Sequence, residues 1–229
     1  PVGITVEGSN TLTKNLIIFG QGLMKSHPFL FNIVNSIQHD DLDMFKKNLN
    51  GMVSNSINLV FMSIYYKIMS NFMFLSNDEK FIEEKYINNF ALTSNLVLLM
   101  GKKFKSNEFT SGRMGEIMGS FYMLQAMDWF NYYHSGKFDT LVKYAKYEEY
   151  NKIQNNLQLI SENYPIFGIR TFLKCINNKS CLEKNLKISD KMIQDVSNIV
   201  SKNTELRKIL SENSYEHPKL KKMNDHLDE

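Results

Sequence analysis

Apolar residues recur at three- and four-residue intervals along most of this chain, and this spacing limits the fold more than any other feature of the sequence. Such intervals place side chains on one face of an α-helix, whereas a half-buried strand alternates at every second residue. Alternation of that kind is almost absent, so the sequence predicts an all-α fold, a helical bundle. The longest run can be capped by Asp40 or Asp41 and consists of Leu42, Phe45, Leu49, Val53, Ile57, Val60 and Ile64.

Capping residues and turn formers divide the rest of the chain into further helices. Ser9 or Asn10 can cap a helix that ends near Lys25, and Pro28 suits the first turn of the next helix. The apolar positions that define the first of these helices are Leu12, Leu16, Phe19 and Leu23.

The second half shows the same organisation. Ser76–Glu79 has the sequence of a capping box and predicts a helix start. Two long helices, at about residues 108–134 and 138–163, are separated by a turn at Ser135–Gly136. Pro165 prevents the second of them from continuing.

Composition excludes several classes of protein. The chain has 229 residues, 43% of them hydrophobic, which is enough to bury a sizeable core. A net charge of +3 is too small to indicate nucleic-acid binding. Cys175 and Cys181 lack the spacing of a zinc site, so no metal is implied and a reduced, cytoplasmic setting is expected. No run of about 18 apolar residues predicts a membrane span.

One carboxylate stands alone near the start of the chain. Glu7 is the only acidic residue among the first 28, and it lies between Val6 and Gly8 directly before a predicted helix start. Such a position holds the carboxylate in place, as a general base requires. The alternative is an acid that merely favours the helix N-terminus, which is common.

The residues around Glu7 resemble a known family. The sequence TVEGSN at residues 5–10, followed by Leu12, Thr13, Lys14 and then IFGQG at residues 18–22, is similar to the catalytic-base segment of the acyl-CoA dehydrogenases. The closest resemblance is to the long bacterial fatty-acid-degrading type, which carries an extra helical region at its C-terminus. The likeness is weaker over SGRMGEIM, residues 111–118, and weaker still after about residue 165.

The resemblance implies a role for each matching residue. Glu7 would remove the α-proton of a fatty acyl-CoA while the β-hydrogen leaves as hydride to FAD, giving a trans-2-enoyl-CoA in fatty acid β-oxidation. Gly8 would contact the substrate, and Ser9 and Thr11 would lie near the flavin, although Thr11 stands where many relatives have Gln. An electron-transfer acceptor and a homo-oligomer are the further partners that the resemblance implies.

The resemblance also predicts how the chain is divided. Residues 1–26 would be the catalytic-base turn and helix of the dehydrogenase bundle, residues 27–213 a helical C-terminal extension, and residues 214–229 a charged, frayed tail. Because the chain opens on Pro1 with the base at position seven, we expect it to be the tail of a longer enzyme and to be inactive alone. The alternative is a non-catalytic helical interaction or oligomerisation module left by truncation.

Several side chains allow a functional and a structural interpretation. Met114, Met118, Tyr122 and Met127 could line an acyl chain, but packing between long antiparallel helices is favoured. The aromatic cluster of Trp129 with residues 132–134 is expected to pack at a helix end, and Gly112, Gly115 and Gly119 to allow close helix approach or a bent first turn. His27 is interpreted as structural.

The segment after Pro165 mixes apolar residues with cations. Ile166, Phe167 and Phe172 lie near Arg170 and Lys174, the pattern of a helix in a membrane interface. That would give peripheral contact with the inner membrane. The favoured alternative is a helix that packs its apolar side onto the protein's own core.

Overall fold

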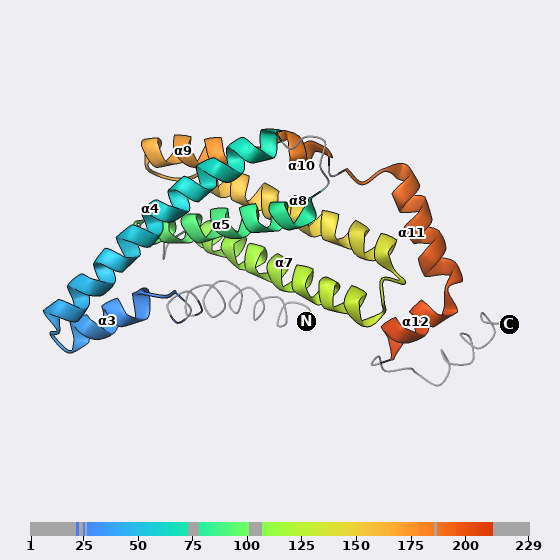
Figure 1. The fold of residues 1–229 in the computed structure, drawn as a ribbon, viewed down its shortest axis with the longest axis horizontal. Helices are drawn as coiled ribbons and strands as arrows, with labels where there is room; N and C mark the ends of the chain where they lie inside the picture. The colour runs from blue at the N-terminus through green and yellow to red at the C-terminus, as the bar shows by residue number, and fades with distance from the viewer. Residues whose placement is uncertain are drawn as a thin grey trace, which may run out of the picture. The chain divides into compact units, whose positions relative to one another are not determined.

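The structure is a computed structural model, and it describes residues 27–72, 78–100, 107–185 and 187–212, together with Gly22 and Lys25. This part of the chain forms nine α-helices and no strand (Figure 1), which confirms the all-α prediction. The helices are α3 (Leu30–Gln38), α4 (Leu42–Phe72), α5 (Glu79–Leu98), α7 (Glu108–Tyr133), α8 (Asp139–Glu162), α9 (Phe167–Asn177), α10 (Cys181–Asn185), α11 (Asp190–Lys202) and α12 (Thr204–Ser211).

The described residues group into two compact units. The first contains those in Pro1–Ala126 and Glu148–Lys187, and the second those in Met127–Tyr147 and Ile188–Glu229. Helices α7 and α8 each contribute to both units. A boundary between the two units therefore falls inside the predicted extension, residues 27–213, and the sequence did not indicate it. The predicted ends of this extension adjoin residues outside the described part, so these ends stay predictions.

The first unit contains an apolar cluster formed by α5, α9 and the segment between α8 and α9. Leu92, Tyr164, Leu173 and Ile176 are buried together there. The Tyr164 hydroxyl donates a 2.7 Å hydrogen bond to the Leu96 carbonyl oxygen, so its polar end is satisfied where its ring is buried. The core of this unit thus joins the C-terminal end of α5 to α9.

Helix starts agree in part with the capping predictions. The Asp41 carboxylate accepts a hydrogen bond from the Met44 amide at 2.9 Å, which confirms Asp41 as the cap of α4. Asp78, and not Ser76, caps α5, because its carboxylate accepts from the Phe81 amide at 3.1 Å. The capping-box prediction was wrong about the capping residue, and Ser76 lies outside the described residues. Pro28 precedes the N-cap of α3 and so lies outside its first turn.

The predicted turn between α7 and α8 is present. Ser135 and Gly136 have φ angles of 52° and 74°, a left-handed conformation that glycine adopts without a steric cost. These two residues reverse the chain and confirm the turn assignment.

Helix α4 turns its apolar run outward. Its buried side chains are Ser63, Tyr66 and Ser70, whereas most of the predicted apolar run is exposed. The inward side makes hydrogen bonds to α5: the Asn88 amide donates to Ser63 Oγ at 2.7 Å, and the Asn95 amide donates to Ser56 Oγ at 3.0 Å. The expectation that such apolar faces pack in the core is wrong for this helix.

Candidate functional site

The residues that the sequence assigns to catalysis and cofactor binding lie outside the described part. Glu7, Gly8, Ser9 and Thr11 all precede Gly22, the first described residue. Their roles as base, substrate contact and flavin contacts stay predictions.

His27 is the described candidate nearest to that segment, and it is a structural residue. It is buried, and its Nδ1 accepts hydrogen bonds from the amides of Phe29 and Leu30 at 3.2 and 3.1 Å. Its Nε2 lies 2.9 Å from Asn95 Oδ1. Since Nδ1 accepts from two amides, the proton of the neutral ring is on Nε2 and is donated to Asn95. His27 therefore takes over the capping of α3, for which the N-cap Phe29 has no suitable side chain.

A buried ion pair joins α5 to α10 in the first unit. Lys85 Nζ lies 2.7 Å from Glu183 Oε2, and the two side chains are 1% and 3% exposed. The same carboxylate oxygen accepts hydrogen bonds from the Ser180 amide at 2.6 Å and the Ser180 hydroxyl at 2.8 Å. This contact ties α10 and the segment before it to α5.

The electrostatics of this pair suit a fixed structural contact. Burial alone would raise the pKa of Glu183, but the Lys85 ammonium and the hydrogen bonds from Ser180 together lower it below its ordinary value. Beside it, burial and then the negative charge of Glu183 raise the pKa of Tyr86 well above its ordinary value. Glu183 therefore stays ionised and Tyr86 stays protonated near neutral pH, so neither is adjusted toward proton transfer at that pH.

The sequence contains a signal for this site that the predictions above did not include. Ser180–Glu183 reads Ser-Cys-Leu-Glu, which fits a capping box, and the side chain of Glu183 does return to the Ser180 amide. Lys85 lies three residues after Ile82 and one before Tyr86, on a face whose other members are buried. A lysine at such a position predicts a buried partner.

Asn177, at the end of α9, is held by polar contacts from two helices. Asn89 Nδ2 donates to its side-chain oxygen at 3.0 Å, and its own Nδ2 donates to Ser161 Oγ at 2.9 Å. Gln154 Nε2 donates to its carbonyl oxygen at 2.5 Å. On the far side, Lys67 Nζ donates to the Asn178 carbonyl oxygen at 2.7 Å. Side chains from α4, α5 and α8 thus fix the C-terminal end of α9.

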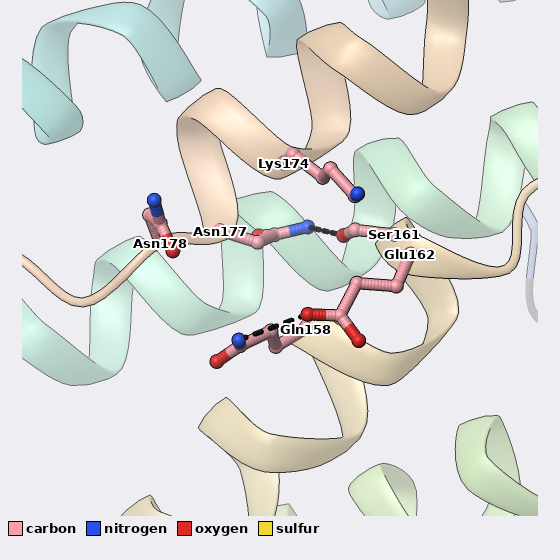
Figure 2. Close-up of a pocket in the computed structure, with 6 residues that line it drawn as sticks. All are labelled: Gln158, Ser161, Glu162, Lys174, Asn177 and Asn178. Atoms are coloured by element: carbon pink, nitrogen blue, oxygen red, sulfur yellow. Dashed lines mark hydrogen bonds between the residues drawn. The ribbon is translucent and has the colours of Figure 1, made fainter. Parts of the chain in front are cut away.

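A small polar pocket adjoins this network (Figure 2). It has a volume of about 240 Å³ and is lined by Gln158, Ser161, Glu162, Lys174, Asn177 and Asn178. Ligand pockets usually measure about 300–1,000 Å³ and are mainly apolar. This pocket is too small and too polar for a flavin ring or a fatty acyl chain, so these residues do not fit FAD, and no catalytic step is assigned to them.

The proposed acyl-chain lining on α7 does not form. Met114 is completely buried in the core, whereas Tyr122 is 73% exposed. The two side chains therefore point to different environments. The favoured interpretation, core packing, holds for Met114 and is wrong for Tyr122.

The aromatic cluster at the end of α7 is exposed. Trp129, Tyr132 and Tyr133 are all exposed, and the Trp129 and Tyr133 rings stack with centroids 5.3 Å apart. The expectation that this cluster packs at a helix end is therefore wrong for these three side chains.

Gly119 also departs from its expected role. A Cβ added there would meet nothing within 4 Å, so close helix approach does not explain this glycine.

The apolar side of α9 packs onto its own protein. Leu173 and Ile176 are buried in the core cluster, and Ile169 and Phe172 pack against it. Only Ile166 and Phe167, at the start of the helix, remain exposed. Membrane contact by this segment stays a prediction that now rests on these two side chains and the neighbouring cations.

Membrane spans and metal clusters are both absent from the described residues. None of their helices is long and apolar enough to cross a membrane. They also contain no group of three or more His, Cys, Asp or Glu side chains that could hold a metal ion.

A comparison with protein families matches most of this chain to a family model. The family model described as "Acyl-CoA dehydrogenase, C-terminal, bacterial type" matches residues 24–229. The match covers all of the helices described above. No solved structure gives a significant match to the chain.

Proposed function

Because the chain belongs to the bacterial-type acyl-CoA dehydrogenase C-terminal family, we propose that it is the C-terminal part of an FAD-dependent enzyme that converts fatty acyl-CoA to trans-2-enoyl-CoA in β-oxidation. The observation that carries the proposal is the combination of this family match with the sequence TVEGSN at residues 5–10. The family match begins at residue 24, so Glu7 enters the proposal on its own sequence context.

Glu7 is the base in this proposal. The α-proton of a thioester is weakly acidic, and a positioned carboxylate contributes roughly 10²- to 10⁴-fold to the rate of its removal. FAD, bound by the complete enzyme, would supply the acceptor for the β-hydrogen. The described helices serve as a scaffold in this proposal, because buried polar groups of α5, α9 and α10 are committed to the Lys85–Glu183 pair and to the end of α9.

The test is a substitution in the full-length enzyme. Glu7→Gln should keep flavin and acyl-CoA binding but lower acyl-CoA-dependent flavin reduction by roughly 10²-fold or more, since the amide keeps the shape and loses the base. Glu108→Gln, at an exposed glutamate that opens α7, is the matched control and should reduce flavin at the wild-type rate. Near-normal reduction by Glu7→Gln would refute the assignment.

The isolated chain provides a second test. It should show helical circular dichroism but purify without stoichiometric flavin, because the proposal places most cofactor contacts outside it. A stoichiometrically yellow chain would contradict this part of the proposal.

A non-catalytic interaction module is the second candidate. The observation that favours it is the long exposed apolar face of α4, which needs no catalytic role. The gene distinguishes the two: a reading frame that encodes helical and β domains of dehydrogenase type before Pro1 supports the enzyme, and translation that starts near Pro1 supports the module.

A further inference from the structure

Helix α4 carries an exposed apolar face from Leu49 to its last residue, Phe72, and Leu42 continues it on the other side of the exposed Lys46. Successive members are mostly three or four residues apart and therefore lie on one side of the helix. Phe61 is 67% exposed and Phe72 75% exposed, and the other members are each at least 40% exposed. We call this surface the α4 face; it consists of Leu42, Leu49, Val53, Ile57, Phe61, Ile64, Tyr65, Ile68 and Phe72.

The orientation of α4 is set by specific contacts on its opposite side. Ser63 and Tyr66 on that side contact Asn88 and Glu84 of α5. Ser56, at the edge between that side and the α4 face, contacts Asn95 of α5. At 100° per residue, Ser63 and Tyr66 lie opposite the centre of the α4 face. Rotating the helix to bury the face would break these hydrogen bonds and leave the amides of α5 without partners. The face is therefore outward in the folded chain.

From Leu49 onward, the α4 face lacks the charges of a solvated surface. Between Lys47 and Phe72 the only charged residue is Lys67, which donates to the Asn178 carbonyl oxygen. Exposed helix faces in soluble monomers normally carry charged residues. Depletion of charge together with aromatic residues is the composition found at the centre of protein interfaces.

The area matches that of a protein interface. With side-chain areas of about 150–250 Å² for aromatic residues and somewhat less for aliphatic ones, nine members at this exposure present roughly 700–900 Å². The largest apolar patch on a typical monomer is about 300–600 Å², whereas a stable interface buries about 800 Å² on each partner. The face is thus large enough for one complete partner surface.

We propose that the α4 face binds the α4 face of a second copy of this chain. An uncharged apolar strip is self-complementary, and an isologous two-fold contact requires a surface that fits itself. A membrane interface would favour lysine and arginine beside the apolar strip, and the central part of this face has none. The pairing goes beyond the proposed function and does not depend on it.

The test measures the mass of the whole chain by sedimentation across a concentration series. The wild-type chain should have the mass of two copies. Ile57→Glu with Phe61→Glu should give one copy with unchanged helical circular dichroism, because both side chains are exposed in the single chain. The matched control, Tyr122→Glu with Phe167→Glu, places the same charges at exposed sites on α7 and α9 and should leave two copies.

Cysteine cross-linking keeps the test decisive if the glutamate variant does not fold. With Cys175 and Cys181 replaced by serine, Ile57→Cys or Phe61→Cys near the middle of α4 should link two chains, and Tyr122→Cys should not. A wild-type chain that remains a single copy, as expected if a different domain or a lipid covers the face, overturns the proposal. A dimer that survives the double glutamate substitution, or that links at Tyr122→Cys and at neither α4 position, also overturns it.

Discussion

Helices α4 and α9 both carry long apolar stripes, yet α9 buries most of its stripe whereas α4 leaves most of its stripe exposed. On α9, Leu173 and Ile176 lie in the core cluster with Leu92. On α4, Ile57 and Phe61 are exposed. The same spacing of apolar residues therefore led to opposite outcomes in one unit of the molecule.

The difference comes from what α5 presents to each helix. Its Leu92 lies in the core cluster with Leu173 and Ile176 of α9, where the apolar side of α9 gains free energy by burial. From α4, Leu59 and Val60 pack against the same cluster. Toward α4, α5 offers Asn88 and Asn95, whose amides donate to serine hydroxyls of α4. Buried amides left without partners cost about 1–3 kcal/mol each, so α4 meets them with its polar side. The partner surface, and not the stripe itself, decides which side of a helix is buried.

The largest effect is expected at the pair that ties α10 to α5. Lys85→Met leaves the Glu183 carboxylate buried without its cation and should lower the free energy of unfolding by about 3–5 kcal/mol, measured by urea denaturation. Lys85→Met with Glu183→Gln removes both charges and keeps a capping side chain at 183, so it should recover most of the loss. A cost below about 1 kcal/mol for the single variant would show that the pair does not anchor this end of the unit.

The same pair predicts acid sensitivity. The folded pKa of Glu183 is lowered, so the unfolded state takes up its proton first as the pH falls. The stability contributed by this group is complete above the unfolded pKa and is lost as the pH falls through the folded pKa, in the acidic range. The free energy of unfolding, measured from neutral to acidic pH, should fall more steeply in the wild-type chain than in Glu183→Gln. Equal slopes of the free energy of unfolding against pH in the two proteins would contradict the lowered pKa of Glu183.

Truncations on the two stripes test the comparison directly. Leu173→Ala should cost about 2–5 kcal/mol because it opens a cavity in the core. Phe61→Ala should change the stability of the single chain by about 0.5 kcal/mol or less, since it removes an exposed side chain. Chemical denaturation at low protein concentration measures both. A large loss in Phe61→Ala under those conditions would place the α4 face inside the single chain.

A smaller effect is expected at the polar contact between α4 and α5. Ser63→Ala removes the hydroxyl that accepts from Asn88, which can still donate to the Leu59 carbonyl oxygen. The free energy of unfolding should fall by about 0.5–1.5 kcal/mol. Ser54→Ala on the exposed side of the same helix is the control. If both variants cost the same, the hydrogen bond does not orient α4.

The smallest effect has the opposite sign. Gly119→Ala should raise the free energy of unfolding by about 0.5–1 kcal/mol, because alanine favours the helix and a Cβ there meets nothing within 4 Å. Gly51→Ala is the contrasting variant, since its Cβ would lie 2.5 Å from Phe29 Cε1 and the ring would have to move. A gain at Gly51 equal to that at Gly119 would show that α3 packs loosely on α4.

Local features were the most predictable part of the molecule. The all-α fold, the cap at Asp41 and the turn at Ser135–Gly136 follow from spacing, a capping carboxylate and a glycine, all of which act within a few residues. The assignment of α5's cap to Ser76 failed because two capping residues stood two positions apart. The Ser180–Glu183 capping box could have been found by the same rule.

The sequence by itself determined that this chain forms long helices and that it belongs with the acyl-CoA dehydrogenases, and it predicts Glu7 as the base. Only the tertiary structure decided which sides of those helices are buried. Lys85 meets Glu183 across 98 positions of the chain, and the amides of α5 select the serine side of α4. Spacing within one helix contains no information about the chemistry of the surface it meets, so contacts between distant segments had to be seen in the folded chain.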